Sequence, residues 1–163
     1  MIKFVLYLNI LLTVSLSAQS FYSTDSTSII KKEKDHLFEF QITKALFDTA
    51  NHNISSIDIN IIDGQPAWGL NWSVPKYEIK TMKLKIDSMD ITIPKELFGF
   101  CYNPNLDSEY VNAYWGKDYK SIFVFMNGGD GVGGYTIAWY FDINGNHSYM
   151  IPRYDDFMFK TQW

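Results

Sequence analysis

The chain has 163 residues, of which 14 are basic and 18 acidic, so its formal net charge is −4 at neutral pH. Arg153 is the only arginine, and the lysines near the N-terminus are interleaved with acidic residues. Because binding to a phosphate backbone needs a basic stripe, this composition excludes nucleic acid as a partner. The single cysteine, Cys101, allows no internal disulfide, and we expect it to be buried as a small apolar residue.

The first twenty residues, 1–20, have the pattern of a secretory signal peptide. Lys3 precedes an apolar stretch from Phe4 to Leu16, and small and polar residues follow it. A stretch of about 13 residues is shorter than the roughly 20 that a membrane-spanning helix needs, so a cleaved leader is favoured over an uncleaved anchor. We therefore expect a secreted or periplasmic protein with no stable membrane anchor. Loss of the leader removes Lys3 and no acidic residue, so the mature protein is more acidic.

The rest of the chain is expected to divide into a short lead-in and one domain. Residues 21–36 are polar and charged, which favours a flexible or weakly helical lead-in, with an edge strand as the alternative. Residues 37–163 are expected to form a single β-rich globular domain. The mature length of about 143 residues suffices to bury roughly two thirds of the unfolded surface.

Alternating apolar and polar residues predict strands in the first half of this domain. The alternation has its apolar positions at Phe38, Phe40 and Ile42, at Ile57, Ile59 and Ile61, and at Met82, Leu84 and Ile86. Asp63-Gly64 and residues 87–90 are turn signals. A short helix is predicted to begin at Pro94, because proline suits the first helical position. Residues 105–119 are mixed and rich in turn residues.

The strongest strand patterns lie at residues 122–126 and 135–143. Asn144-Gly145 predicts a two-residue hairpin loop, whose register would place Trp139 opposite Met150 and Thr136 opposite Arg153. The second face of this sheet, which includes Phe123 and Phe125, is unusually apolar for a solvent face. We expect the N-terminal segment or the Pro94 helix to cover it, and an exposed partner-binding patch is the alternative.

Together these patterns predict a mainly β fold. We expect a single antiparallel β domain, either a sandwich or a curled sheet, with one or two short helices.

Five of the seven residues from Gly128 to Gly134 are glycine, and strands are predicted on both sides of them. A strand rather than a helix follows, which excludes a dinucleotide-binding loop. One interpretation is a hairpin connection whose glycines allow bulging and close packing against Trp or Tyr. The other is an anion-binding nest of backbone N–H groups at Gly128, Gly129 and Gly131, complemented by Arg153 unless Asp130 pairs with that arginine.

Aromatic residues supply a second candidate site, whereas catalytic patterns are missing from the sequence. Trp68 and Trp72 lie between Pro66 and Pro75, in a predicted loop that would project them as a platform for a sugar ring, and core filling is the alternative. The histidines at 36, 52 and 147 form no metal-binding motif, and no cofactor motif is present. The D-x-N-x-N pattern from Asp142 is explained by the hairpin turn rather than by calcium.

The favoured functional hypothesis is a non-enzymatic binding or structural module with an unknown protein or glycan partner. One alternative is a hydrolase of envelope or extracellular glycan, with Asp130 or the Asp155-Asp156 pair as acids. The other is a small acidic inhibitor or immunity-type protein that neutralises a basic partner.

Overall fold

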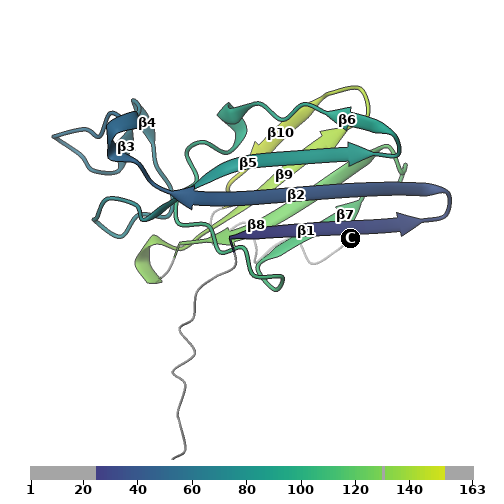
Figure 1. Cartoon of the computed structure of the whole chain (residues 1–163), viewed down its shortest axis with the longest axis horizontal. Coiled ribbons are helices and arrows are strands. Elements are labelled where there is room, and N and C mark those ends of the chain that lie inside the picture. The colour runs from purple at the N-terminus through teal and green to yellow at the C-terminus, as the bar shows by residue number, and fades with distance from the viewer. Residues whose placement is uncertain (1–24, 130, 153–163) are drawn as a thin grey trace, which may run out of the picture.

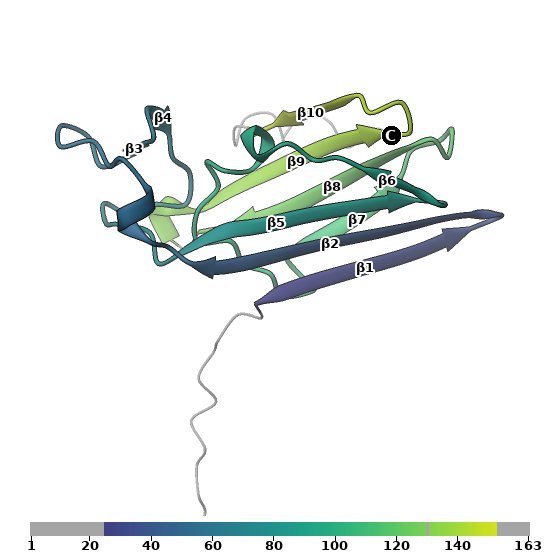
Figure 2. The same cartoon turned by 45° about the horizontal axis from the view of Figure 1, so that its top comes forward.

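Two four-stranded antiparallel sheets pack face to face in the computed structural model, which describes residues 25–129 and 131–152 (Figures 1 and 2). The first sheet has the order β1-β2-β5-β6 and the second the order β10-β9-β8-β7. The first contains β1 (Ser26–Glu33), β2 (His36–Leu46), β5 (Tyr77–Ile86) and β6 (Met89–Ile91). The second contains β7 (Val111–Trp115), β8 (Ser121–Gly128), β9 (Tyr135–Asp142) and β10 (His147–Met150). The predicted antiparallel β domain is confirmed, in its sandwich form.

Short elements lie in the connections between these strands. A small hairpin, β3 (Ile61–Ile62) with β4 (Gln65–Pro66), lies between β2 and β5 in the sequence. Its two-residue loop is the predicted Asp63-Gly64 turn, and both residues have positive φ. The helical elements of the described residues are three single 3-10 turns: η1 (Thr49–Asn51), η2 (Lys95–Leu97) and η3 (Gly131–Gly133).

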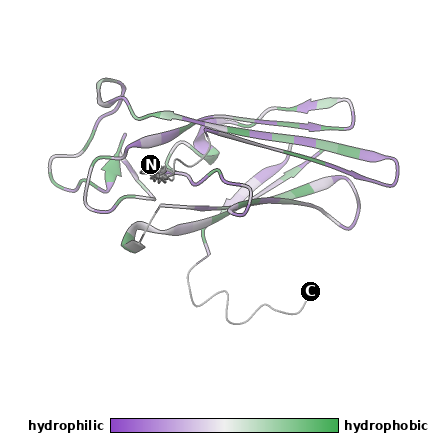
Figure 3. Cartoon of the chain, turned by 60° about the horizontal axis from the view of Figure 1, so that its bottom comes forward, coloured by the Kyte–Doolittle hydropathy of each residue, from purple (hydrophilic) through white to green (hydrophobic). Residues whose placement is uncertain are grey.

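The core forms between the inner faces of the two sheets. Along β2, Phe38, Phe40 and Ile42 are buried while Glu39 and Gln41 are exposed, which confirms the predicted alternation. Figure 3 shows polar and apolar residues mixed along the strands in this way. The inner positions of β5, β7, β8 and β9 belong to the same apolar cluster. Each sheet therefore buries its inner face against the inner face of the other sheet.

Trp139 anchors the predicted Pro94 helix to this core. Its side chain is fully buried, and its indole Nε1 donates a hydrogen bond of 2.7 Å to the carbonyl of Leu97. Leu97 closes the single 3-10 turn that follows Pro94, and Leu97 and Phe98 belong to the core cluster. The predicted short helix is therefore present, and it packs at the core rather than on the outside of a sheet.

Part of the lead-in forms an edge strand, which is the alternative, so the expectation of a flexible or weakly helical segment is wrong for residues 26–33. Residues 26–33 form β1, which pairs along its whole length with β2. The inward positions are Thr27, Ile29 and Lys31. Lys31 donates to the carbonyl of Ala113 on β7 and lies over the ring of Tyr114, so a lysine joins the two sheets at this edge. A charged residue at an inward position hid the strand alternation.

The strand predicted from Ile57 to Ile61 is wrong over most of its length. Its only strand residues are those of the two-residue β3, and Ile57 is 96% exposed. The hydroxyl of Ser55 accepts from the N–H groups of Ile57 and Asp58, and the Asp58 carboxylate accepts from the N–H of Asn60. These short polar side chains hydrogen-bond the backbone locally and outcompete strand pairing.

The hairpin after β9 differs from its predicted register by one residue. Tyr149 rather than Met150 lies opposite Trp139, because the loop has three residues and includes Gly145 at φ +82°. The Asp142 carboxylate accepts from the backbone of Asn144 and from both the backbone and the side chain of Asn146, which stabilises this wider turn. Met150 is therefore exposed rather than in the core. Arg153, predicted to lie opposite Thr136, is outside the described residues.

Residues 105–119 contain a strand that the sequence analysis did not predict. β7 pairs with β8 and buries Val111 and Ala113, with the larger Asn112 and Tyr114 facing outward. The inward residues range from Ala113 to Trp115, and the outward Tyr114 is itself a large apolar residue, so the period-two signal is weak.

The second face of the C-terminal sheet is not covered by either predicted segment. The N-terminal segment forms β1 in the other sheet, and the turn after Pro94 packs at the core. Phe123 and Phe125 on this face are exposed. The expectation that one of these segments covers them is wrong.

We expect Trp139→Phe to lower the free energy of unfolding by about 2–3 kcal/mol. The substitution removes buried volume and leaves the Leu97 carbonyl without its donor. Urea unfolding monitored by circular dichroism measures the change. Trp72→Phe, on an exposed tryptophan, is the control and should stay within about 0.5 kcal/mol of the parent. Equal effects of the two substitutions would contradict this account of the core.

Candidate functional site

Three segments distant in sequence meet at one end of the sandwich, which we call the loop end: residues 67–76, 101–105 and 128–134. Trp68 and Tyr102 are joined by a hydrogen bond from the Tyr102 N–H to the Trp68 carbonyl, and the Trp68 N–H donates to the carbonyl of Phe100. Pro104 bridges to Gly128. The predicted glycine and tryptophan sites, separated by about 60 residues in the sequence, therefore belong to one surface.

Asn103 holds these segments together. Its side-chain carbonyl accepts from the N–H groups of Lys76 and Tyr77, and its amide donates to the carbonyl of Gly69. Its backbone carbonyl accepts from the N–H of Gly129. Asn103 has φ +47°, a left-handed conformation that asparagine tolerates better than most residues. One side chain and its backbone thus fix both loops that flank the groove described below.

The glycines allow backbone and ring packing too close for a side chain. A Cβ on Gly128 would lie 2.4 Å from the ring of Tyr135, and one on Gly133 would lie 2.5 Å from the carbonyl oxygen of Leu70. This geometry supports the interpretation in which the glycines permit close packing against an aromatic side chain. Gly131 begins the 3-10 turn η3.

The described structure includes only some of the residues that the anion-nest hypothesis requires. The Gly129 N–H donates to Asn103, so it is already engaged. Asp130 and Arg153 lie outside the described residues, and so does the Asp155-Asp156 pair of the hydrolase alternative.

A groove of about 450 Å³ opens at the loop end beside Gly129. Its polar lining includes the side chains of Asn71, Ser73, Lys76 and Asn105. No carboxylate is among the described residues that line this groove, and Lys44 lines it as well. The lining therefore includes amide and hydroxyl residues and Lys76, whereas Lys44 is buried.

Lys44 is a buried lysine on the inner side of β2, where the pairing with β5 shifts register. Burial lowers the pKa of its ammonium group, and the carboxylates of Asp25 and Asp107 act in the opposite direction. The ammonium lies 4.7 Å from the centre of the Tyr77 ring. Lys76 lies 5.2 Å from the same ring, so two cations share one aromatic side chain.

Trp72 is the most exposed aromatic side chain at the loop end. Its exposed fraction is 75%, against 42% for Trp68. Its φ is +54°, in the left-handed region where a bulky residue costs of order 1–3 kcal/mol. The fold therefore holds a large apolar ring in water on a strained backbone.

A buried histidine cluster supports the neighbouring hairpin, and the sequence analysis did not find it. The His52 ring is sandwiched between carboxylates, with Nδ1 2.7 Å from Asp63 and Nε2 3.0 Å from Glu78. It stacks on Phe47, with ring centres 4.5 Å apart. Each ring nitrogen therefore lies within hydrogen-bond distance of one carboxylate. The three residues are 11 and 26 positions apart, a spacing that matches no motif.

The described residues contain no group of three or more His, Cys, Asp or Glu side chains that could hold a metal ion. Cys101 is buried, as predicted, and its burial raises the pKa of the thiol. Within the same part of the chain, no helix has the length and hydropathy to cross a membrane.

We expect Gly128→Ala to lower the free energy of unfolding by about 1–3 kcal/mol, because the new methyl group overlaps the Tyr135 ring. The measurement is a double-mutant cycle with Tyr135→Leu, which removes the clashing atoms. The cost of Gly128→Ala should be smaller in the Tyr135→Leu background. An equal cost in both backgrounds would show that this contact does not determine the requirement for glycine.

We expect the contribution of Asp63 to stability to disappear in acid. The N–H of Asn53 and, to a lesser extent, the His52 ring hold the pKa of the Asp63 carboxyl below its ordinary value of 3.8. A carboxyl whose pKa is lowered on folding stabilises the protein above the ordinary value and loses this effect as pH falls through the lowered one.

The measurement compares urea midpoints of the parent and Asp63→Asn from pH 7 to pH 2. The parent should have the higher midpoint near neutrality, and the gap should close below about pH 4. Asp90→Asn, on the exposed strand β6, is the control and should show little gap at any pH. A gap for Asp63→Asn that stays constant to pH 2 would contradict the role given to its charge.

No protein-family model matches this chain, and neither a curated protein nor a solved structure does. The chemistry of the loop end therefore has to be inferred from its own residues.

Proposed function

We propose that this chain is an exported, non-enzymatic binding module that holds a glycan at the loop end. The observation that carries the proposal is Trp72, an exposed residue on a strained backbone, whose chain neighbours Asn71 and Ser73 line a polar groove. The apolar face of an indole ring stacks on the C–H face of a sugar, and the neighbouring polar groups hydrogen-bond its hydroxyls.

The groove chemistry suits a saccharide better than an apolar ligand. The side chains of Asn71 and Ser73 can donate and accept hydrogen bonds, as sugar hydroxyls do. Lys76 adds a positive charge, so glycans that carry carboxylates are favoured over neutral ones. The loops that flank the groove are fixed by Asn103, which lowers the entropy lost on binding.

Binding is favoured over hydrolysis at this site. Glycosidases of the common kind need two carboxyl groups on either side of the scissile bond. The described lining of the groove offers amides and lysines instead. Export is inferred from the leader pattern of residues 1–20. This pattern predicts a secreted or periplasmic location.

Affinity electrophoresis of the mature protein in gels that contain neutral or carboxylated polysaccharides tests the proposal. We expect retardation by at least one carboxylated polysaccharide. Trp72→Ala should weaken it about tenfold or more, which corresponds to about 1.4 kcal/mol of lost stacking. Lys76→Gln should weaken the binding of carboxylated polysaccharides more than that of neutral ones.

Tyr114→Ala is the matched control, because it removes an exposed aromatic ring from the outside of the second sheet. It should leave retardation unchanged. If Tyr114→Ala abolished binding while Trp72→Ala did not, the ligand would lie on the sheet, and the loop end would be the wrong site. If no polysaccharide in the panel retarded the parent, the glycan proposal would be dropped.

A further inference from the structure

The outside of the second sheet carries a continuous aromatic surface, which we call the outer face. Tyr114, Phe123 and Phe125 on it are 50%, 39% and 36% exposed. The rings contact one another: Tyr114 and Phe125 have centres 6.0 Å apart, and Phe123 and Tyr140 have centres 5.3 Å apart. The outward positions, from β7 to β10, are Asn112, Tyr114, Ser121, Phe123, Phe125, Asn127, Thr136, Ala138, Tyr140, Asp142, Ser148 and Met150.

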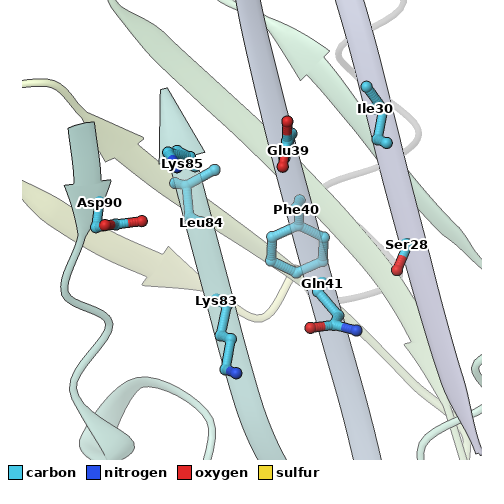
Figure 4. Close-up of a pocket in the computed structure, with 9 residues that line it drawn as sticks. All are labelled: Ser28, Ile30, Glu39, Phe40, Gln41, Lys83, Leu84, Lys85 and Asp90. Carbon is cyan, nitrogen blue, oxygen red and sulfur yellow. The ribbon is translucent and has the colours of Figure 1, made fainter. Parts of the chain in front are cut away.

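The first sheet shows what a solvent-facing surface looks like in this protein. Figure 4 shows a shallow pocket on its outside, where Glu39, Lys83, Lys85 and Asp90 project from β2, β5 and β6. Charges of both signs alternate there. Among the outward positions of the outer face, Asp142 at the end of β9 is the one charged residue, and it is buried. Because monomers seldom leave so large an apolar surface bare, the difference indicates that something covers the outer face.

The chain continues beyond the edge strand of this sheet with a segment that contains both apolar and charged residues. The described structure ends at Pro152, two residues after the edge strand β10. The eleven residues that follow, 153–163, include five large apolar side chains: Tyr154, Phe157, Met158, Phe159 and Trp163. We propose that residues 153–163 pack on the outer face and cover its aromatic surface.

The length of this segment is sufficient for the proposal. Neighbouring strands lie about 4.8 Å apart, so crossing from β10 to β7 requires roughly 15 Å. Eleven residues reach about 36 Å when extended. The segment can therefore cross all four strands and still turn at its start.

Attachment to the same chain favours this occupant over a second copy of the protein. A short tether gives a local concentration in the millimolar range, whereas a second copy must associate from dilute solution. The two segments that could otherwise cover the face are used elsewhere, since β1 belongs to the first sheet and η2 packs at the core.

Thiol labelling tests the proposal directly. Ala138 lies at the centre of the outer face, between Phe125 and Met150 in register, so Ala138→Cys places a small reporter there. The natural Cys101 is 1% exposed and should not react in the folded protein. The reporter is compared in two full mature chains, one with the natural segment and one with Tyr154→Ser, Phe157→Ser, Phe159→Ser and Trp163→Ser.

We expect the reporter to react at least tenfold faster in the chain with the four serines. Ser28→Cys, on the exposed outside of the first sheet, is the control and should react at the same rate in both chains. A reciprocal reporter guards against a change in folding: Met158→Cys should be protected in the natural chain and should react faster when Phe125→Ser is added.

Equal reporter rates in the two chains, with monomers confirmed by light scattering, would overturn the proposal. Protection that is lost on dilution, together with a dimeric mass, would also overturn it by assigning the outer face to a second copy. Because the loop end does not include this face, either result leaves the glycan-binding proposal to its own test.

Discussion

Burial of one face of each sheet against the other is the constraint on which this structure depends. The inner face of each sheet is covered by the other sheet. The apolar inner positions of β2, β5, β8 and β9 are therefore shielded from water only when the two sheets pack together. Trp139 fills the space between them and ties the turn after Pro94 to the core through one hydrogen bond. With no disulfide available, apolar burial has to hold the sandwich together.

The loop end is organised by hydrogen bonds rather than by that core. Asn103 joins the two flanking loops, and the glycines let the backbone approach Tyr135 and Leu70. This arrangement leaves side chains at the rim without a packing role. Trp72 can therefore project into water without weakening the sandwich. A rigid support under exposed, adaptable side chains is the usual plan of a binding surface built from loops.

Much of the fold could be predicted from the sequence, because most strands alternate cleanly and the turns have their usual residues. β2, β5, β8 and β9 and the turns at Asp63 and Asp87 follow from these patterns. The misses have local causes. Ser55 and Asp58 divert an alternating stretch into turns, Lys31 occupies an inward position at an edge, and Asp142 widens a hairpin by one residue. Each of these outcomes depends on where one side chain finds its hydrogen bond.

The sequence analysis singled out the glycine run and the tryptophans of the loop end, but not the residues that line the groove, such as Lys76 and Asn103. Exposed tryptophans and a glycine run are visible in the sequence as separate features. Their meeting depends on Asn103 and on the contact of Gly133 with Leu70, which only the folded chain brings together. The His52 cluster could not be predicted from the sequence for the same reason, because its three residues come from three different segments.

The division of the sheets along the chain has a consequence for the order in which the protein matures. Residues 26–91 supply all four strands of the first sheet, and residues 111–150 supply all four strands of the second. The first sheet is therefore synthesised in full before the second begins. Until the second sheet is synthesised, the apolar inner face of the first sheet has no partner to pack against and is exposed to aggregation.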